Sequence, residues 1–306
     1  MPYSPHRAPI ALFVYNRPNH VRHTLDALKN NNHASKSDII IFSDGPKSES
    51  DKEAVAEVRD IIHNLSGFQS IKITEHPMNK GLASSVISGV NEVLINFDRV
   101  IVLEDDIMTS PEFLNYMNQA LDFFEAESKV WHINGYAHPI SEDLLGDVFM
   151  NRVMDCWGWA TWRDRWKFFE KDPLELTKKM TLAQIKTFDL DGTNEFWPQV
   201  QRNISGEANT WAIFWYATIF LQEGLCVSPS KSFTYNIGFD GTGDNCLDDG
   251  LPVKIDTPLN TNAKFNFSEP LQENIIAISR IREHYLSRRS IFTRLQTKLK
   301  KIFFLK

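Results

Sequence analysis

The chain of 306 residues has 42% hydrophobic and 24% charged residues, which excludes a disordered or fibrous protein and allows one large domain or two small ones. Its net charge is −6, but the segment from Arg280 to Lys306 has nine Lys or Arg and one acid, so the remainder carries −14 and nucleic-acid binding is not expected. The three cysteines lack CxxC spacing, and the chain has neither a signal-peptide core nor about 20 consecutive apolar residues, which together predict a cytoplasmic protein.

The first 135 residues predict alternating strands and helices. Short apolar runs indicate strands at residues 10–15, 39–42, 71–73, 100–103 and 130–133. Apolar residues at helical spacing indicate helices at residues 18–28, 51–65, 81–97 and 111–124. This alternation predicts an α/β fold with a mostly parallel central sheet flanked by helices, in which ligands bind beyond the carboxyl ends of the strands.

Three consecutive carboxylates, Glu104, Asp105 and Asp106, follow the fourth predicted strand directly. Their mutual repulsion would raise their pKa values, and a divalent cation would relieve it. Mg²⁺ or Mn²⁺ prefers oxygen ligands and is commonly held by one or two carboxylates together with phosphate oxygens. The alternative is a solvated acidic turn at the start of a helix.

Two cations and one further acid also follow strands or precede a helix. Arg17 could hold a phosphate with two hydrogen bonds, and Lys80 lies just before a helix N-terminus, which favours anions. Both could equally be surface cations. Asp44 could accept the N3 proton of uracil, or could form a turn with Gly45.

The second half of the chain is rich in aromatic residues. It has seven of the eight tryptophans, which supply either a core or flat faces for sugar rings: Trp157, Trp159, Trp162, Trp166, Trp197, Trp211 and Trp215. No repeat or Pro/Gly-rich linker separates the halves, so one continuous domain is expected.

Four segments together resemble the GT-A nucleotide-sugar glycosyltransferases: FVYNRP (13–18), FSDGP (42–46), NKGLASSV (79–86) and VIVLEDD (100–106). The chain is similar to the Golgi N-acetylglucosaminyltransferase that begins complex N-glycans and to related bacterial family-2-like sugar transferases. The resemblance is continuous from residue 10 to about 135. It resumes at Cys156–Trp162, at Asn209–Ile213 and at Asn236–Gly243.

The resemblance implies a GT-A fold in which residues 1–135 would be the nucleotide-sugar-binding half and residues 136–267 the aromatic-rich acceptor-side half of the same domain. It does not cover the chain beyond about residue 267, where the charge and apolar pattern of residues 268–306 predicts a basic amphipathic helical tail. The implied activity is that of a metal-dependent, inverting glycosyltransferase. It would move GlcNAc, Glc or Gal from a UDP-sugar to a glycan or a lipid-linked saccharide, in bacterial surface polysaccharide synthesis.

The resemblance also implies roles for individual residues. Asp106 would coordinate Mn²⁺ or Mg²⁺, Asp105 would contact the ribose or the metal shell, and Glu104 the sugar. The other implied donor-binding residues are Asn16, Arg17, Asp44 and Lys80, and the implied acceptor-side residues are Trp157, Trp159 and Trp211.

The general base is not readable from the resemblance. The Golgi enzyme has a carboxylate where this chain has Asn209, and an amide cannot take a proton at neutral pH. Glu207, two residues upstream, is the favoured substitute, followed by Asp155 and then Asp240. Their structural alternatives are a loop acid, a helix cap and a turn former.

Asn209 also leaves two other functions open. One is a nucleotide-sugar-binding protein with impaired turnover. The other is a nucleotidyltransferase, although that class usually has a Gly-rich loop after the first strand, where this chain has Tyr15-Asn16-Arg17-Pro18.

The C-terminal tail alternates cations with apolar residues such as Phe292, Leu295 and Phe303. This pattern predicts either a helix lying on the anionic inner face of a membrane or a helix packed on the protein itself or on a second subunit.

Overall fold

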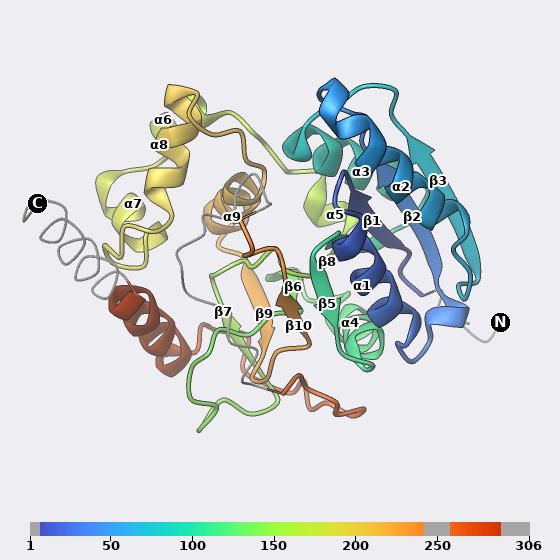
Figure 1. The fold of residues 1–306 in the computed structure, drawn as a ribbon. Helices are drawn as coiled ribbons and strands as arrows, with labels where there is room; N and C mark the ends of the chain where they lie inside the picture. Colours follow the sequence, from blue (N-terminus) through green and yellow to red (C-terminus); the bar gives the residue numbers. More distant parts are fainter. Residues whose placement is uncertain (1–6, 242–257, 289–306) are drawn as a thin grey trace, which may run out of the picture.

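The computed structural model describes residues 7–241 and 258–288 (Figure 1). Within these residues the central sheet has eight strands in the order β3-β2-β1-β4-β8-β6-β9-β7. The strands are β1 (Ile10–Val14), β2 (Asp38–Ser43), β3 (Ser70–Glu75), β4 (Arg99–Glu104), β6 (Val130–Asn134), β7 (Val148–Asn151), β8 (Trp159–Trp162) and β9 (Leu225–Pro229). Six of them run in one direction and β7 and β8 run against them, which confirms the mostly parallel central sheet.

Helices cover both faces of the sheet. The α-helices are α1 (Pro18–Lys29), α2 (Lys52–His63), α3 (Leu82–Asn96), α4 (Phe113–Phe123), α5 (Arg163–Trp166), α6 (Pro173–Lys179), α7 (Leu182–Phe188), α8 (Trp197–Ser205) and α9 (Ala212–Leu221), with 3₁₀ turns at Ala34–Lys36 and Glu49–Asp51. Residues 275–288 are also helical. None of the helices in the described residues is long and apolar enough to cross a membrane.

The central strands are buried on both sides because their residues alternate between two apolar cores. Ala11 and Phe13 of β1 pack in the core that α3 covers. Ile10, Leu12 and Val14 pack in the core formed with α1, α2 and α4. This two-sided burial explains why β1 and β4 are continuous apolar runs rather than alternating ones.

Five strands of the described residues, β5 (Ile107–Thr109), β7, β8, β9 and β10 (Thr234–Asn236), were not predicted from the sequence. β8 inserts antiparallel between β4 and β6, so one sheet is shared by the N-terminal and C-terminal halves. β5 directly follows the three carboxylates and pairs with β10 in a second, two-stranded sheet. This pairing brings the residues after β10 to the carboxylates.

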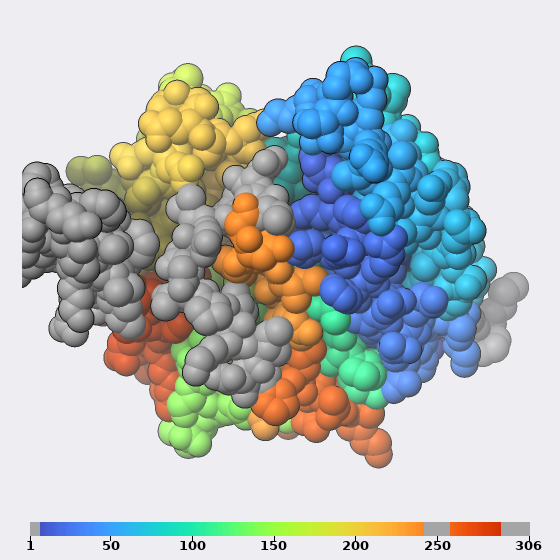
Figure 2. All heavy atoms as spheres, in the orientation of Figure 1, coloured from blue at the N-terminus to red at the C-terminus, as the bar shows by residue number. Residues whose placement is uncertain are grey.

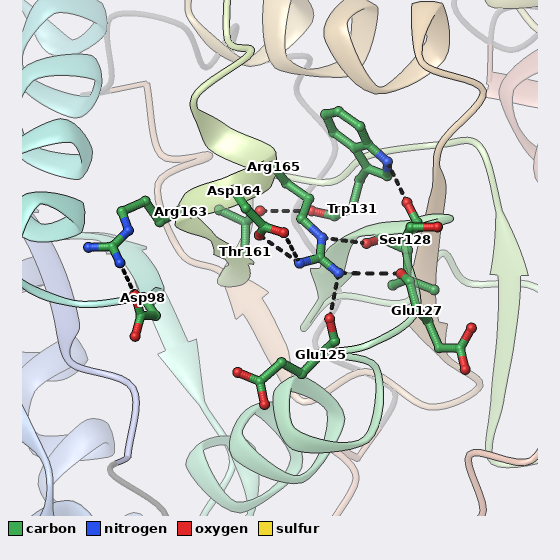
Figure 3. A network of polar contacts seen from close by, with 10 residues as sticks. Asp98, Glu125, Glu127, Ser128, Trp131, Thr161, Arg163, Asp164 and Arg165 are labelled. Carbon is green, nitrogen blue, oxygen red and sulfur yellow. Dashed lines mark hydrogen bonds and ion pairs between the residues drawn. The ribbon is translucent and has the colours of Figure 1, made fainter.

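A buried arginine holds β8 and α5 against the chain that precedes β6 (Figure 3). Arg165 is 6% exposed, pairs with both carboxylate oxygens of Asp164 at 2.6 Å, and donates to the carbonyl oxygen of Glu125 at 2.7 Å. Its guanidinium also lies 4.7 Å from the centre of the Trp162 ring, a cation–π distance. The network fixes the inserted strand in its place between β4 and β6.

Figure 1 shows the N-terminal strands and helices (blue to teal) on one side of the molecule and α6, α7 and α8 (yellow) on the other. In the space-filling view, the orange segment around β10 lies on the near face of the molecule, beside the blue N-terminal region (Figure 2).

Candidate functional site

The candidate site lies at the carboxyl ends of β1, β2 and β4. The parallel register places Phe13 of β1 beside Phe42 of β2 and beside Glu104 of β4. The residues that follow these three strands therefore meet at one edge of the sheet, as the sequence predicts for Arg17, Asp44 and the carboxylates.

Arg17 lies against two of the three carboxylates. It pairs with Asp105, and its Nη2 lies 2.9 Å from Oδ2 of Asp106. Both aspartates are 4% exposed. Although burial disfavours its charge, the two aspartates raise the pKa of Arg17 above its usual value. The single guanidinium of Arg17 thus lies next to a cluster of three carboxyl groups, Glu104, Asp105 and Asp106.

This shortage of positive charge affects the acids. Burial, together with Asp106 and Asp105, raises the pKa of Glu104, and a hydrogen bond from the Trp211 side chain partly offsets that rise. Burial also raises the pKa of Asp105, while Arg17 lowers it. The site can therefore accept more positive charge than its own residues supply.

Two buried polar atoms of the site have no hydrogen-bond partner, Oδ1 of Asp106 and Nη1 of Arg17. An unpaired carboxylate oxygen suits a divalent cation, and an unpaired guanidinium nitrogen suits a phosphate oxygen. Among residues 7–241 and 258–288, no three His, Cys, Asp or Glu side chains converge as a complete metal cage. The residues present therefore fit a metal held by few carboxylates and completed by a diphosphate and water.

The segment after β10 packs directly on Asp106. The backbone nitrogen of Ile237 donates to the Asp106 carbonyl oxygen at 2.9 Å. A Cβ on Gly238 would lie 2.2 Å from Oδ2 of Asp106, so only glycine permits this approach. Asp240, in the turn that follows, lies 3.3 Å from Nε2 of His20 at the start of α1.

Asp44 occupies the N-terminus of α3. Its carboxylate accepts from the backbone nitrogens of Lys80 at 2.9 Å and of Gly81 at 3.0 Å, and also from that of Gly45. The anion position expected at Lys80 is therefore filled by the protein's own carboxylate, and only the exposed Lys80 side chain is left to meet a ligand. Asn16 donates to Asp51, in the 3₁₀ turn before α2.

The predicted acceptor-side tryptophans differ in exposure. Trp159 is fully buried and stacks on Trp211, their ring centres 5.2 Å apart, so it is a core residue and cannot present a face to a sugar. Trp211 is 3% exposed and bonds to Glu104 through its side chain. Trp157 is half-buried.

The candidate bases lie in different settings. Asn209 is exposed and accepts a hydrogen bond from Lys171, and Glu207 is exposed in the same loop between α8 and α9. The Asp240 side chain is 45% exposed, whereas that of Asp155 is 16% exposed and lies 3.2 Å from His138. No helix begins at Asp155, so the helix-cap alternative is wrong.

Tyr136, His138 and Phe239 were not predicted from the sequence as site residues. Tyr136 and His138 follow the carboxyl end of β6, so the strand-end rule applied to the earlier strands would have found them. Phe239 lies in the segment that packs on Asp106, a contact that depends on the β5–β10 pairing. A separate cavity of about 300 Å³, lined by residues including Asp38, Ser70 and Phe97, lies at the opposite ends of β2 and β3 and is not part of this site.

Comparison with known proteins places the chain in a family. One similar solved structure is a mannosyltransferase from Pyrobaculum calidifontis in complex with GDP-Man and Mn²⁺; the identity is 11%, the match covers 71% of this chain and 69% of that chain, and the TM-score is 0.39. Another is S. aureus TarS; the identity is 10%, the match covers 74% of this chain and 36% of that chain, and the TM-score is 0.42. The sequence model of the GNT-I family matches residues 2–171, more than half of the chain. The chain therefore belongs to the GNT-I family of glycosyltransferases.

Proposed function

We propose that this protein transfers a sugar, with inversion, from a UDP-sugar to a glycan or lipid-linked saccharide in a reaction that needs Mn²⁺ or Mg²⁺. The observation that carries this proposal is the pair of buried, unpartnered atoms on Asp106 and Arg17 at the carboxyl ends of the parallel strands. A carboxylate oxygen and a guanidinium nitrogen side by side match the two charges of a metal–diphosphate group.

In this proposal each residue near the strand ends has one task. Asp106 holds the metal, which when bound would neutralise the charge that develops on the departing diphosphate. Arg17 turns its free Nη1 to a phosphate oxygen, Asp105 contacts the ribose, and Glu104 contacts the sugar.

Three further residues would complete the donor site. Asp44 would read the uracil from the start of α3, Lys80 would approach the phosphates with its exposed side chain, and Asn16 would line the nucleotide. Residues 1–135 thus bind the donor and residues 136–267 the acceptor. GlcNAc, Glc and Gal are the sugars proposed.

Asn209 favours a second candidate function, a protein that binds nucleotide sugars without turnover. The position at which a carboxylate is expected holds an amide that Lys171 engages. Release of UDP from a UDP-sugar separates the two candidates, because a binding protein would bind UDP and release none.

The test measures UDP binding by calorimetry with and without Mn²⁺. Asp106→Asn should weaken metal-dependent UDP binding by more than roughly 100-fold, since loss of even an outer partner of a metal ligand costs about 10–100-fold. The matched control is Asp98→Asn, at the other end of β4, where the exposed carboxylate pairs with Arg163. Unchanged UDP affinity in Asp106→Asn would refute the donor site.

A donor panel then tests turnover. Wild-type protein with Mn²⁺ is given UDP-GlcNAc, UDP-Glc, UDP-Gal and, as a different nucleotide, GDP-Man. Metal-dependent release of UDP from at least one donor supports the transferase, and binding without any release supports the second candidate.

A further inference from the structure

Asp155 has a backbone that is fixed on both sides. Its nitrogen donates to Oδ1 of Asn134 at 2.8 Å, and its carbonyl oxygen accepts from Nε2 of His132 at 3.1 Å. Asn134 is held in turn, because its amide donates to the Val153 carbonyl and to Ser228. Asp155 is thus anchored to the carboxyl end of β6, the kind of rigid support that a catalytic group requires.

His138 lies beside the Asp155 carboxylate. Its Nε2 is 3.2 Å from Oδ2 of Asp155, and this buried nitrogen makes no aligned hydrogen bond. Tyr285, from the helix at residues 275–288, packs against the His138 ring with ring centres 5.3 Å apart. Hydrogen bonds of catalytic groups are commonly misaligned without ligand and tighten when it binds.

A row of half-buried aromatic rings connects this pair to the carboxylates. Tyr136 and Trp157 have ring centres 4.5 Å apart, and Trp157 and Phe239 5.4 Å apart. The next residue back from Phe239 is Gly238, which touches Asp106. The row therefore begins at the proposed metal ligand and ends next to His138, whose ring centre is 5.4 Å from that of Tyr136.

Cys156, the half-buried residue that directly follows Asp155, is influenced by the charges of both Asp155 and the carboxylates. Burial raises the pKa of its thiol, and Glu104, Asp155 and Asp106 raise it further. The thiol of Cys156 therefore lies within electrostatic range of both Asp155 and the carboxylates.

We propose that Asp155, oriented by His138, takes the proton from the hydroxyl of an acceptor sugar that packs on Tyr136, Trp157 and Phe239. This assignment rests on the proposed glycosyltransferase function. The acceptor O–H proton passes to the Asp155 carboxylate as the oxygen forms a bond to the anomeric carbon of the donor sugar. The bond from that carbon to the diphosphate breaks, its electron pair leaves with UDP, and Asp155 later returns the proton to water.

The other candidates lack this support. Glu207 and Asn209 are exposed on a loop, and Asn209 cannot take a proton. The Asp240 side chain is 45% exposed and lies 3.3 Å from His20 of α1, a helix of the half proposed to bind the donor. A catalytic base held on a rigid element accelerates the reaction more than a base on a loop, because a misplacement of about 1 Å can lower the rate about 10²-fold.

The experiment measures the rate of UDP release in the presence of Mn²⁺. The donor is the UDP-sugar that the wild-type protein turns over best, at a saturating concentration. The acceptors are water and the methyl glycosides of Glc, Gal, Man and GlcNAc. Asp155→Asn should lower kcat by about 10²–10⁴-fold and leave UDP affinity unchanged. Asp155→Glu keeps the carboxylate and should retain more activity than Asp155→Asn. The matched control is Asp143→Asn, an exposed acid between β6 and β7.

His138 is a positioning residue, so its variants test whether the orientation of the Asp155 carboxylate, rather than the stability of the fold, determines the rate. His138→Leu should lower kcat by about 10–100-fold without changing the donor KM, and His138→Gln, which keeps an N–H donor, should restore most of that loss. Trp157→Ala should raise the KM for the methyl glycoside that most increases UDP release. Trp197 is a half-buried tryptophan of α8, and Trp197→Ala should leave that KM unchanged.

The outcomes distinguish the two proposals. A wild-type protein without metal-dependent UDP binding, or one that binds UDP and releases none, contradicts the transferase and this assignment with it. A working wild-type enzyme whose Asp155→Asn variant keeps near-normal kcat, or loses less than Glu207→Gln does, overturns the assignment of Asp155 alone. Glycosides that bind no better to wild-type protein than to Trp157→Ala reject the aromatic row as a sugar subsite.

Discussion

His132 is a buried residue that positions the backbone of Asp155 through a hydrogen bond. The indole nitrogen of Trp215 can only donate, and it lies 3.1 Å from Nδ1 of His132, so that nitrogen accepts. Nε2 therefore carries the proton that is donated to the Asp155 carbonyl. Burial lowers the pKa of His132 to about 4, so the imidazole is neutral at pH 7 and both hydrogen bonds persist.

We predict that this histidine makes folding sensitive to acid. Its pKa is lowered from 6.5 in the unfolded chain to about 4, so its stabilisation is complete above pH 6.5 and is lost progressively as the pH falls from 6.5 to 4, by about 3 kcal/mol in all. Urea unfolding between pH 7 and 4 should show a steeper loss for wild-type protein than for His132→Gln.

The comparison with His132→Gln removes the effect of other groups. Glu104 and Glu273 have raised pKa values, which act with the opposite sign on stability, but they are common to both proteins. Equal pH slopes in the two proteins would contradict the neutral, doubly bonded imidazole.

At the scale of single elements, α3 depends on an acid that is distant in sequence. Asp44, at the end of β2, accepts from the backbone nitrogens of Lys80 and Gly81 at 2.9 and 3.0 Å, where no side chain of the helix itself serves as a cap. The loop that ends β2 is therefore coupled to the start of α3.

We predict that Asp44→Ala destabilises the protein by about 2 kcal/mol, because it removes the cap and leaves several partly buried backbone donors unpaired. Asp172→Ala is the matched control, since Asp172 caps the exposed start of α6 by accepting one bond from Glu175. Its cost should be about 0.5–1 kcal/mol. Urea denaturation measures both, and equal costs would show that Asp44 is not the principal cap of α3.

The elements that could be predicted from the sequence are those whose apolar pattern is local. The first four strands, the fifth at residues 130–133 and the helices between them are all present, and the strand-end rule located Arg17, Asp44 and Asp106. β8 has the sequence Trp-Ala-Thr-Trp, which gives no sign of its place, because insertion between β4 and β6 depends on contacts distant in sequence. For Trp159 the sequence left both a core role and a sugar-binding face open, and its complete burial decides for the core.

At the scale of the whole molecule, the chain divides into an acidic body and a basic end. Residues 289–306, the last part of the predicted tail, lie outside the described residues. The helix at residues 275–288 that precedes them is docked, since Arg280 donates to the carbonyl oxygens of Ser141 and Asp143.

We predict that a chain ending at Arg289 loses binding to vesicles of phosphatidylserine, because the cut removes five Lys or Arg, each worth about 1 kcal/mol near an anionic surface. Flotation of full-length and shortened protein measures this, and phosphatidylcholine vesicles are the control. Identical flotation of the two forms on phosphatidylserine would exclude a membrane role for the tail.

The insertion of β8 has a consequence for a chain that is still being synthesised. β6 leaves the ribosome before β8, yet the two neighbours of β8 in the finished sheet are β4 and β6. Until residue 162 has emerged, the edge of β4 has no partner, and an open strand edge invites pairing with other chains. The exposed edge of β4 in the N-terminal half is therefore covered only after β8, which lies beyond that half, has been synthesised. The efficiency of folding should then depend on the rate of translation as well as on stability.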